Sequence, residues 1–358
     1  MNPMIKINDK NIGVGHSVFI IAELSANHNG NLNTAFNTIK AAKRAGADAI
    51  KLQTYTADTM TIDCKSDDFR LKQGTIWDGR YLYDLYKEAN TPWEWHEELF
   101  KAAKKEGLIC FSSPFDRTAV DLLEKLNAPA YKIASFEITD IPLIEYVASK
   151  GKPIIISTGI AGVDDIDLAI DACKRMSNEH IILLKCTSSY PAPINESNMA
   201  MIPDMSRRFG VITGLSDHSI GFTLPVVATV MGAKVIEKHF ILNTSIGGPD
   251  ASFSLNEEEF TAMVKAVREA EVAIGKVDYT ITDKMLISRE FSRSLYVVED
   301  IKAGELITEQ NVRSIRPGFG LHPKHLKTIL GQRAKVKLKK GLPLKFEYIK
   351  CTSSASDK

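Results

Sequence analysis

Eight short apolar runs, separated by amphipathic segments, constrain the fold of this chain more than any other feature of its sequence. The runs are rich in β-branched residues and almost continuous in hydrophobicity, a pattern typical of strands that are buried on both faces. They occupy residues 19–23, 49–53, 109–113, 131–135, 153–158, 182–186, 211–216 and 235–240. Apolar residues spaced three and four apart predict helices between and after them, for example at residues 34–46, 116–127, 164–176 and 256–275.

Eight strands with eight following helices predict an α/β fold, a closed (β/α)8 TIM barrel over residues 1–280. A doubly wound open sheet is the alternative. It is disfavoured because no glycine-rich dinucleotide turn follows the first run. The chain has 358 residues, which leaves room for a second, smaller domain.

The character of the sequence changes after residue 280. We expect a linker over residues 281–290, a small β-rich domain over residues 291–350, and a flexible tail over residues 351–358. The small domain is basic, since residues 313–350 contain Glu347 as their single acid. Three interpretations stay open: a solvated basic face, a weak nucleic-acid surface without interleaved aromatics, or a cation that reaches an anionic active site.

Composition excludes several other classes of protein. The net charge of +1 favours neither a nucleic acid nor a membrane as partner. The five cysteines are scattered, which argues against a disulfide framework. No apolar run is long enough to span a membrane, and no secretory signal pattern is present. We therefore expect a soluble, reduced, cytoplasmic protein.

Barrel enzymes carry their catalytic groups at the C-terminal ends of the strands. Many polar residues occur at these positions, and their convergence on one rim predicts an active site. The residues at or just after the strand ends are Glu23, Lys51, Gln53, Ser112, Ser113, Lys132, Ser135, Glu137, Thr187, Ser188, Tyr190, Ser216, Asp217, His218, Glu237, Lys238 and His239.

Two histidines end neighbouring strands of the predicted barrel. Buried polar groups at such positions cost free energy unless a partner satisfies them. His218 and His239 as a pair favour a divalent transition metal with open coordination positions for water or substrate. The alternative for each is a histidine that is hydrogen-bonded to a loop backbone.

Two lysines, Lys51 and Lys132, point toward the same barrel mouth, where they repel each other unless an anion lies between them. With nearby serines they could hold a phosphate or carboxylate. Two alternatives stay open: a Schiff-base lysine, and a salt bridge to Glu23 or Glu237. Glu23 is a candidate general base, and Asp250 a candidate ligand of hydroxyl or amide groups.

The long stretch of residues 66–95 follows the second run and is rich in aromatic residues. Its aromatics could form a lid over the barrel mouth. Alternatively, Leu82, Leu85 and Tyr86 could pack a short helix against the side of the barrel.

The chain resembles the sialic acid synthases, which condense phosphoenolpyruvate with an acylamino sugar. The resemblance covers about residues 3–350 and rests on several independent motifs in the same order. The motifs are AELSANHNG (22–30), IKLQT (50–54), YKIASFE (131–137), KCTSSYPAP (185–193), GLSDHS (214–219), EKHF (237–240), GGPD (247–250) and RPGFG (316–320).

The resemblance implies a (β/α)8 barrel followed by an antifreeze-like (SAF) domain, in a domain-swapped homodimer whose Arg316 reaches the partner's sugar. It implies manganese or magnesium on His218 and His239, and it assigns Glu23 to the water or its proton. The implied contacts of phosphoenolpyruvate are Lys51, Ser113, Lys132, Ser135, Ser188 and Ser216. Those of the sugar are Gln53, Glu137, Tyr190, Asp250 and Arg316.

The sequence departs from the sialic acid members at two positions, where they have asparagine and this chain has Ser188 and, in the lid, Trp77. Within the family, residues 22–30, 290–301 and 315–325 most resemble the branch that makes pseudaminic acid. The sugar of that branch is a 2,4-diacetamido-2,4,6-trideoxy-altropyranose, which lacks a 6-hydroxyl and which an aromatic such as Trp77 would suit. The alternatives are a synthase of N-acetylneuraminic or legionaminic acid and, more remotely, a non-catalytic carbohydrate-binding protein.

Overall fold

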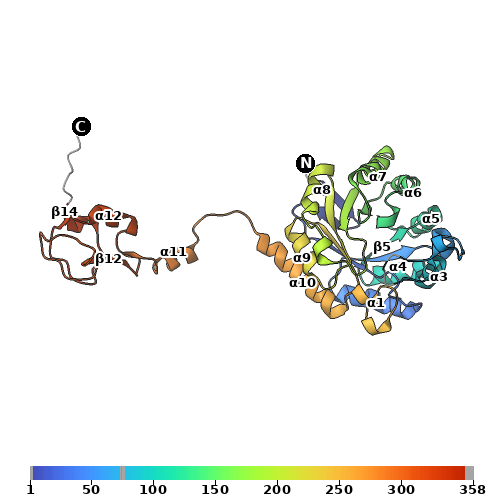
Figure 1. The fold of residues 1–358 in the computed structure, drawn as a ribbon, viewed down its shortest axis with the longest axis horizontal. Coiled ribbons are helices and arrows are strands. Elements are labelled where there is room, and N and C mark those ends of the chain that lie inside the picture. Colours follow the sequence, from blue (N-terminus) through green and yellow to red (C-terminus); the bar gives the residue numbers. More distant parts are fainter. Residues whose placement is uncertain (1–2, 73, 75–76, 351–358) are drawn as a thin grey trace. The chain divides into compact units, whose positions relative to one another are not determined.

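The computed structural model describes residues 3–72, 74 and 77–350 (Figure 1). The chain divides into two compact units, Met1–Gly275 and Lys276–Lys358. The expected tail at residues 351–358 lies outside the described residues.

The first unit contains a closed barrel of eight parallel strands, in which each strand pairs with its neighbours in chain order and the last pairs with the first. This confirms the predicted (β/α)8 barrel and excludes the open sheet. The strands are β3 (Phe19–Glu23), β4 (Ala49–Thr54), β5 (Ile109–Pro114), β6 (Tyr131–Ile133), β7 (Ile154–Ser157), β8 (Ile181–Cys186), β9 (Ile212–Asp217) and β10 (Val235–His239).

Amphipathic helices surround the strands (Figure 1). The last one begins where the sequence predicts, because Asn256 and Glu259 form a reciprocal capping box at its first turn. The barrel helices are α1 (Leu32–Arg44), α4 (His96–Lys105), α5 (Arg117–Lys125), α6 (Ile141–Ala148), α7 (Val163–Arg175), α8 (Met201–Phe209), α9 (Thr223–Val230) and α10 (Glu257–Ile274).

An antiparallel hairpin packs its apolar side chains with those of the barrel interior. It consists of β1 (Met4–Ile7) and β2 (Lys10–Gly13). Ile7 and Ile12 are fully buried in one cluster with Phe19, Ile21 and Phe111 of the strands. Because apolar residues fill this part of the interior, the polar strand ends are left to form a site at the opposite, C-terminal end.

The described residues between β4 and α4 include two short α-helices, α2 (Ala57–Met60) and α3 (Leu82–Ala89). Leu85 of α3 is buried, and the ring of Tyr86 makes an edge contact with Tyr55, at 5.8 Å between centroids. Helix α3 thus packs as the second interpretation of this stretch describes.

The second unit has a small apolar core of its own, which includes Leu295, Val312 and Leu344. Two two-stranded antiparallel sheets and a short helix surround this core. The residues of the expected linker include α11 (Asp283–Arg289). The other elements are β11 (Ser294–Val297), β12 (Val312–Ile315), α12 (Leu326–Ile329), β13 (Arg333–Ala334) and β14 (Ile349–Lys350).

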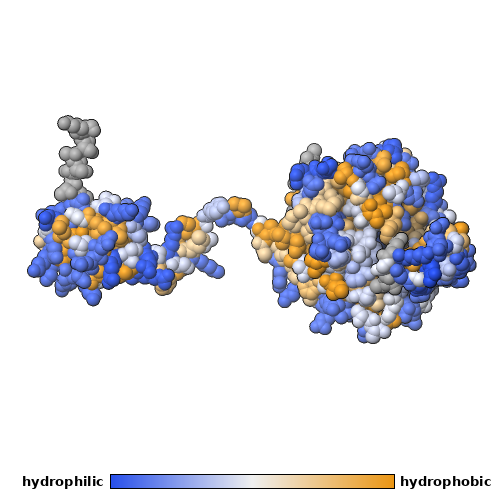
Figure 2. All heavy atoms as spheres, viewed as in Figure 1, coloured by the Kyte–Doolittle hydropathy of each residue, from blue (hydrophilic) through white to orange (hydrophobic). Residues whose placement is uncertain are grey.

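Apolar residues occur on the surface of both units (Figure 2). Val272 near the end of α10 and Val277 just after it are 82% and 89% exposed. Within the described part of the chain, no helix is both long and apolar enough to cross a membrane.

Candidate functional site

Side chains alternate between the two faces of strands β9 and β10, and this alternation builds one side of the site. Asp217 and Lys238 face away from the barrel interior and pair with each other, with 2.7 Å between Lys238 Nζ and Asp217 Oδ2. The side chains on the other face, which interact with groups of the barrel mouth, are Ser216, His218, Glu237 and His239.

Two buried lysines and two buried glutamates form the centre of the barrel mouth. Lys51 Nζ lies 2.6 Å from Glu23 Oε2 and 3.8 Å from Glu237 Oε2. Lys132 Nζ lies 3.9 Å from Glu237 Oε1, which also accepts a 2.8 Å hydrogen bond from Ser216 Oγ. The salt bridges considered from the sequence are therefore present. The charges balance as two cations against two carboxylates.

Burial sets unusual protonation behaviour in this cluster. Burial raises the pKa of Glu23 to about 7, although the ammonium of Lys51 acts in the opposite direction. Burial also lowers the pKa of Lys132. For Glu237, burial acts to raise the pKa, but Lys132 and Lys51 outweigh it and hold the pKa below its usual value. The cluster thus contains a carboxyl group that can exchange a proton near neutral pH.

Serine hydroxyls lie around the two lysines. Lys51 Nζ donates to Ser113 Oγ at 3.3 Å, and the backbone N–H of Gly159 donates to Ser135 Oγ at 3.2 Å. Ser188 Oγ is buried and has no hydrogen-bond partner among the described residues. A Cβ on Gly159 would lie 2.0 Å from Ser188 Oγ and 2.7 Å from Ser135 Oγ. The absence of a side chain at Gly159 therefore keeps space for both hydroxyls.

The two histidines lie side by side, with 5.2 Å between their ring centroids. His239 Nδ1 is buried without a hydrogen-bond partner among the described residues and lies 3.7 Å from Asp250 Oδ2. His218 Nδ1 lies 3.3 Å from the carbonyl oxygen of Thr187, so the loop-backbone alternative applies to one nitrogen of His218.

The histidine pair fits a divalent cation that takes its other ligands from water or substrate. Burial and the neighbouring cations hold the pKa of His239 well below its usual value, which keeps the imidazole neutral, the form that binds metals. A closed protein site does not fit: the described residues contain no group of three or more His, Cys, Asp or Glu side chains arranged for a metal.

A chain of hydrogen bonds joins the candidate sugar ligands to the central cluster. Gln53 Nε2 donates to Glu23 Oε1 at 3.0 Å and to Ser25 Oγ at 2.9 Å. Ser25 Oγ donates in turn to Asp250 Oδ2 at 2.5 Å. Burial raises the pKa of Glu137 to about 7, and its Oε2 has no hydrogen-bond partner among the described residues. These groups can bind hydroxyl or amide groups of a sugar.

Aromatic rings form a wall beside His218. The ring of Tyr190 lies 4.5 Å from the ring of His218 and 5.4 Å from that of Phe253, between centroids. Trp77 also packs against Tyr190, with 5.4 Å between the ring centroids. Part of the 66–95 stretch therefore does reach the barrel mouth, as the lid interpretation describes.

One predicted site residue belongs to the second unit. Arg316 follows β12, is exposed, and forms a cis peptide bond with Pro317. The remaining predicted residues all belong to the first unit and lie on the strands of its barrel or in the loops that follow them.

Sequence reasoning missed two features of the site. Gly159 carries a sequence signal, since it follows β7 almost directly, but its role depends on side chains of two other strand ends. The outward pair of Asp217 and Lys238 follows from strand alternation combined with the register of β9 and β10.

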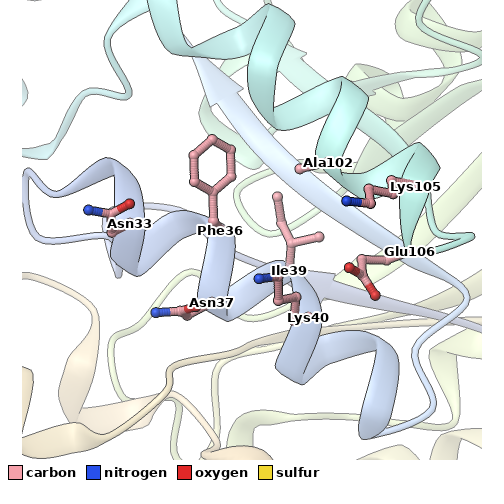
Figure 3. A pocket seen from close by; sticks show the side chains of 8 residues that line it. All are labelled: Asn33, Phe36, Asn37, Ile39, Lys40, Ala102, Lys105 and Glu106. Carbon is pink, nitrogen blue, oxygen red and sulfur yellow. The ribbon is translucent and has the colours of Figure 1, made fainter.

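A separate pocket lies between α1 and α4 (Figure 3). It has a volume of about 340 Å³, and its lining includes Phe36, Lys40 and Lys105. Its side chains belong to the helical layer and not to the strand ends, so it is distinct from the candidate site.

Comparisons with known proteins identify the family of this chain. The NeuB family model matches residues 38–279, and the SAF domain model matches residues 292–349. A pseudaminic acid synthase of Campylobacter jejuni is 49% identical over 94% of this chain and 97% of its own length. One of Helicobacter pylori is 50% identical over 92% and 97%.

A solved structure is also similar. The N-acetylneuraminic acid (sialic acid) synthetase of Leptospira borgpetersenii matches with a TM-score of 0.72 and 28% identity, over 80% of this chain and 95% of that one. These matches confirm the resemblance to the sialic acid synthases. The NeuB model covers most of the barrel, the SAF model covers the second domain, and the relatives match over nearly the whole chain. This protein therefore belongs to the NeuB family.

Proposed function

We propose that this chain is a pseudaminic acid synthase, a transferase that condenses phosphoenolpyruvate with 2,4-diacetamido-2,4,6-trideoxy-altropyranose and water. The products are pseudaminic acid and phosphate. The observation that carries the proposal is the identity of about half of all residues with two pseudaminic acid synthases over nearly their whole length. The polar cluster at the barrel mouth supplies groups suited to each reactant.

Phosphoenolpyruvate is bound by the lysine and serine groups. Its phosphate and carboxylate are anions, and Lys51 and Lys132 provide two buried cations for them. The hydroxyls of Ser113, Ser135 and Ser188 complete the anion site, together with Ser216. The unpartnered hydroxyl of Ser188 supports this assignment, because a buried hydroxyl without a partner is costly unless a ligand satisfies it.

The sugar is bound in its open-chain form at the other side of the site. Gln53, Glu137, Tyr190 and Asp250 bind its hydroxyl and acetamido groups. His218 and His239 would hold a manganese or magnesium ion, which supplies Lewis-acid polarisation of the aldehyde oxygen when bound. The unpartnered Nδ1 of His239 supports this arrangement.

The reaction joins C3 of phosphoenolpyruvate to the aldehyde carbon, so the electron pair of its double bond forms the new C–C bond. Positive charge develops at C2, and a water molecule adds there. Glu23 takes the proton of this water, which its pKa near 7 allows at neutral pH. The aldehyde oxygen takes up one proton and becomes a hydroxyl, which balances the proton that Glu23 removes from the water. The C2–O bond to phosphate then breaks, the hydroxyl left at C2 passes its proton to the departing phosphate and becomes the carbonyl, and Lys51 and Lys132 stabilise that phosphate.

We also propose a domain-swapped homodimer, in which Arg316 of one subunit reaches the sugar of the other. Exposed apolar side chains after α10 support this proposal, because a second subunit would bury them: Val277 and Tyr279 are 89% and 93% exposed, and Phe291 is 67% exposed.

The four described cysteines are free, which fits the cytoplasmic location that we propose.

The test measures phosphate release from phosphoenolpyruvate in the presence of Mn²⁺, with and without a chelator. The two sugars compared are the 2,4-diacetamido-2,4,6-trideoxy-altropyranose and N-acetylmannosamine. Chelator-sensitive release with the first sugar alone is the expected result. Release with N-acetylmannosamine alone would move the assignment to N-acetylneuraminic acid, and release with neither sugar would reject both.

A further inference from the structure

A buried ion pair lies directly behind the two histidines. In the register of β9 and β10, Asp217 and Lys238 are opposite each other. The residues that follow them directly in the chain are His218, just after the end of β9, and His239, the last residue of β10. The side chains of Asp217 and Lys238 are 1% and 0% exposed. They face away from the substrates, so the proposed reaction uses neither.

The pair also holds the backbone of Ser219, the residue that follows His218. Lys238 Nζ donates to the carbonyl oxygen of Ser219, and the backbone N–H of Ser219 donates to Asp217 Oδ1 at 2.9 Å. The residues immediately before and after His218 are therefore both tied to the residue immediately before His239. This fixes the backbone of both histidines relative to each other.

A purely stabilising role explains this arrangement poorly. Removing two charges from water costs free energy that the ion pair recovers only in part. A protein in which apolar residues of similar size replace such a pair is therefore often at least as stable. A buried pair that joins two adjacent strand ends instead restricts geometry. The groups whose geometry it restricts are two imidazoles with 5.2 Å between their ring centroids.

We propose that the Asp217–Lys238 ion pair is a positioning device that holds His218 and His239 at the separation at which both bind one divalent cation. The inference rests on the proposed function, since it requires the metal that we assign to the histidines. Both residues act through the histidines and touch no substrate.

The test is the Mn²⁺ dissociation constant of the full chain, measured from the electron paramagnetic resonance signal of free Mn²⁺. The first variant is Lys238→Met, which keeps the length of the side chain and removes its charge. Because this variant leaves Asp217 charged and buried, a second variant, Asp217→Asn with Lys238→Met, removes both charges and keeps the acceptor for Ser219. We expect each to bind Mn²⁺ about 10- to 100-fold more weakly than the wild type.

The matched control is Arg268→Met. Arg268 of α10 also joins elements of the barrel, since it donates to the carbonyl of Val18 and pairs with Asp48. These two partners directly precede β3 and β4, at the opposite end of the strands from the histidines. The Arg268→Met variant should have a lower free energy of unfolding than the wild type and the same affinity for Mn²⁺. Circular dichroism and a denaturant titration of every variant show that the folded protein is measured.

The outcomes separate this inference from the proposed function. The positioning role is supported if the wild type binds Mn²⁺, both pair variants bind it more weakly, and Arg268→Met binds it as tightly as the wild type. A second outcome is that the wild type binds Mn²⁺ more tightly than His239→Ala does, while the folded double variant binds Mn²⁺ as tightly as the wild type. The positioning role is then wrong and the metal assignment stands. If the wild type binds no Mn²⁺, both are wrong.

Discussion

Lys51 Nζ lies 2.6 Å from Glu23 Oε2, and both side chains are almost completely buried at the barrel mouth. Even beside this cation, burial raises the pKa of Glu23 to about 7. Glu23 can accept a proton only as the carboxylate, so kcat/KM should fall as the pH drops below 7 and rise through that value. The measurement is a pH profile of phosphate release.

The control variant for this prediction is Glu23→Gln, which keeps the shape and the contact with Gln53 but cannot take a proton. Its rate should be about 10²- to 10⁴-fold lower, the usual contribution of a general base. The rising limb near pH 7 should disappear from its profile. A variant that keeps the same limb would assign the titration to another group.

The space at Gly159 is the subject of the second prediction. In Gly159→Ala the new Cβ would meet Ser188 Oγ and Ser135 Oγ, at 2.0 and 2.7 Å in the present geometry. Both hydroxyls must move, so the KM for phosphoenolpyruvate should rise at least about tenfold, and stability should fall by about 1–3 kcal/mol. Steady-state kinetics and thermal unfolding measure the two effects.

Gly162→Ala is a matched control in the same loop. A Cβ there would lie 3.6 Å from Asp165 Oδ2, which is ordinary van der Waals contact. Both the KM and the melting temperature should stay close to those of the wild type. An unchanged KM in Gly159→Ala would remove Ser135 and Ser188 from the anion site.

The fold could be predicted from the sequence because a buried parallel strand needs a continuous apolar run, and eight such runs are present. The strand ends were equally predictable, since polar residues interrupt each run at its C-terminal end. Capping residues such as Asn256 marked a helix start, because their side chains satisfy free backbone N–H groups.

Interactions between distant strand ends could not be predicted in the same way. The motif SDH suggests three polar groups acting together, but alternation directs Asp217 to the far side of the strand from Ser216 and His218. The cradle at Gly159 depends on the relative heights of three loops, which no local pattern specifies. Trp77 reaches Tyr190 from a long loop, whose path depends on tertiary packing.

The third prediction concerns the histidine pair. His218→Ala and His239→Ala should each abolish Mn²⁺-dependent activity, because one imidazole cannot replace two as ligands. His239 Nδ1 has no hydrogen-bond partner among the described residues, so its loss should leave the protein folded. Activity assays at increasing Mn²⁺, with thermal unfolding of each variant, test this. Full activity of either variant in the presence of chelator would contradict the metal assignment.

The fourth prediction addresses the proposed domain swap. Arg316→Ala and His239→Ala should each be inactive as homodimers. When the two variants are unfolded together and refolded, the mixed dimer has one site with an intact barrel and an intact Arg316 from the partner. Activity should therefore return to about a quarter of the wild-type value if subunits assort at random. No recovery in mixed dimers, isolated with two different tags, would place Arg316 in the site of its own subunit.

The fifth prediction concerns the choice of sugar. Trp77 packs against Tyr190, which itself lies against His218, so the indole extends an aromatic wall beside the proposed sugar site. An apolar wall favours a sugar with a methyl group at C6 over one with a hydroxyl, because the hydroxyl would lose its hydrogen bonds to water there. Trp77→Ala should lower the ratio of kcat/KM for the trideoxy sugar over N-acetylmannosamine by about tenfold.

A second tryptophan provides the control for this prediction. Trp93 lies in the same long stretch, at the start of a short 3₁₀ turn before α4, and makes none of the ring contacts described for Trp77. Trp93→Phe should leave the ratio unchanged, and Trp77→Phe should preserve most of it, because phenylalanine keeps an apolar ring. If Trp77→Ala keeps the wild-type ratio while both substrates still react, the selectivity for the trideoxy sugar arises from the polar groups that contact C2 and C4, and the aromatic wall only supports Tyr190.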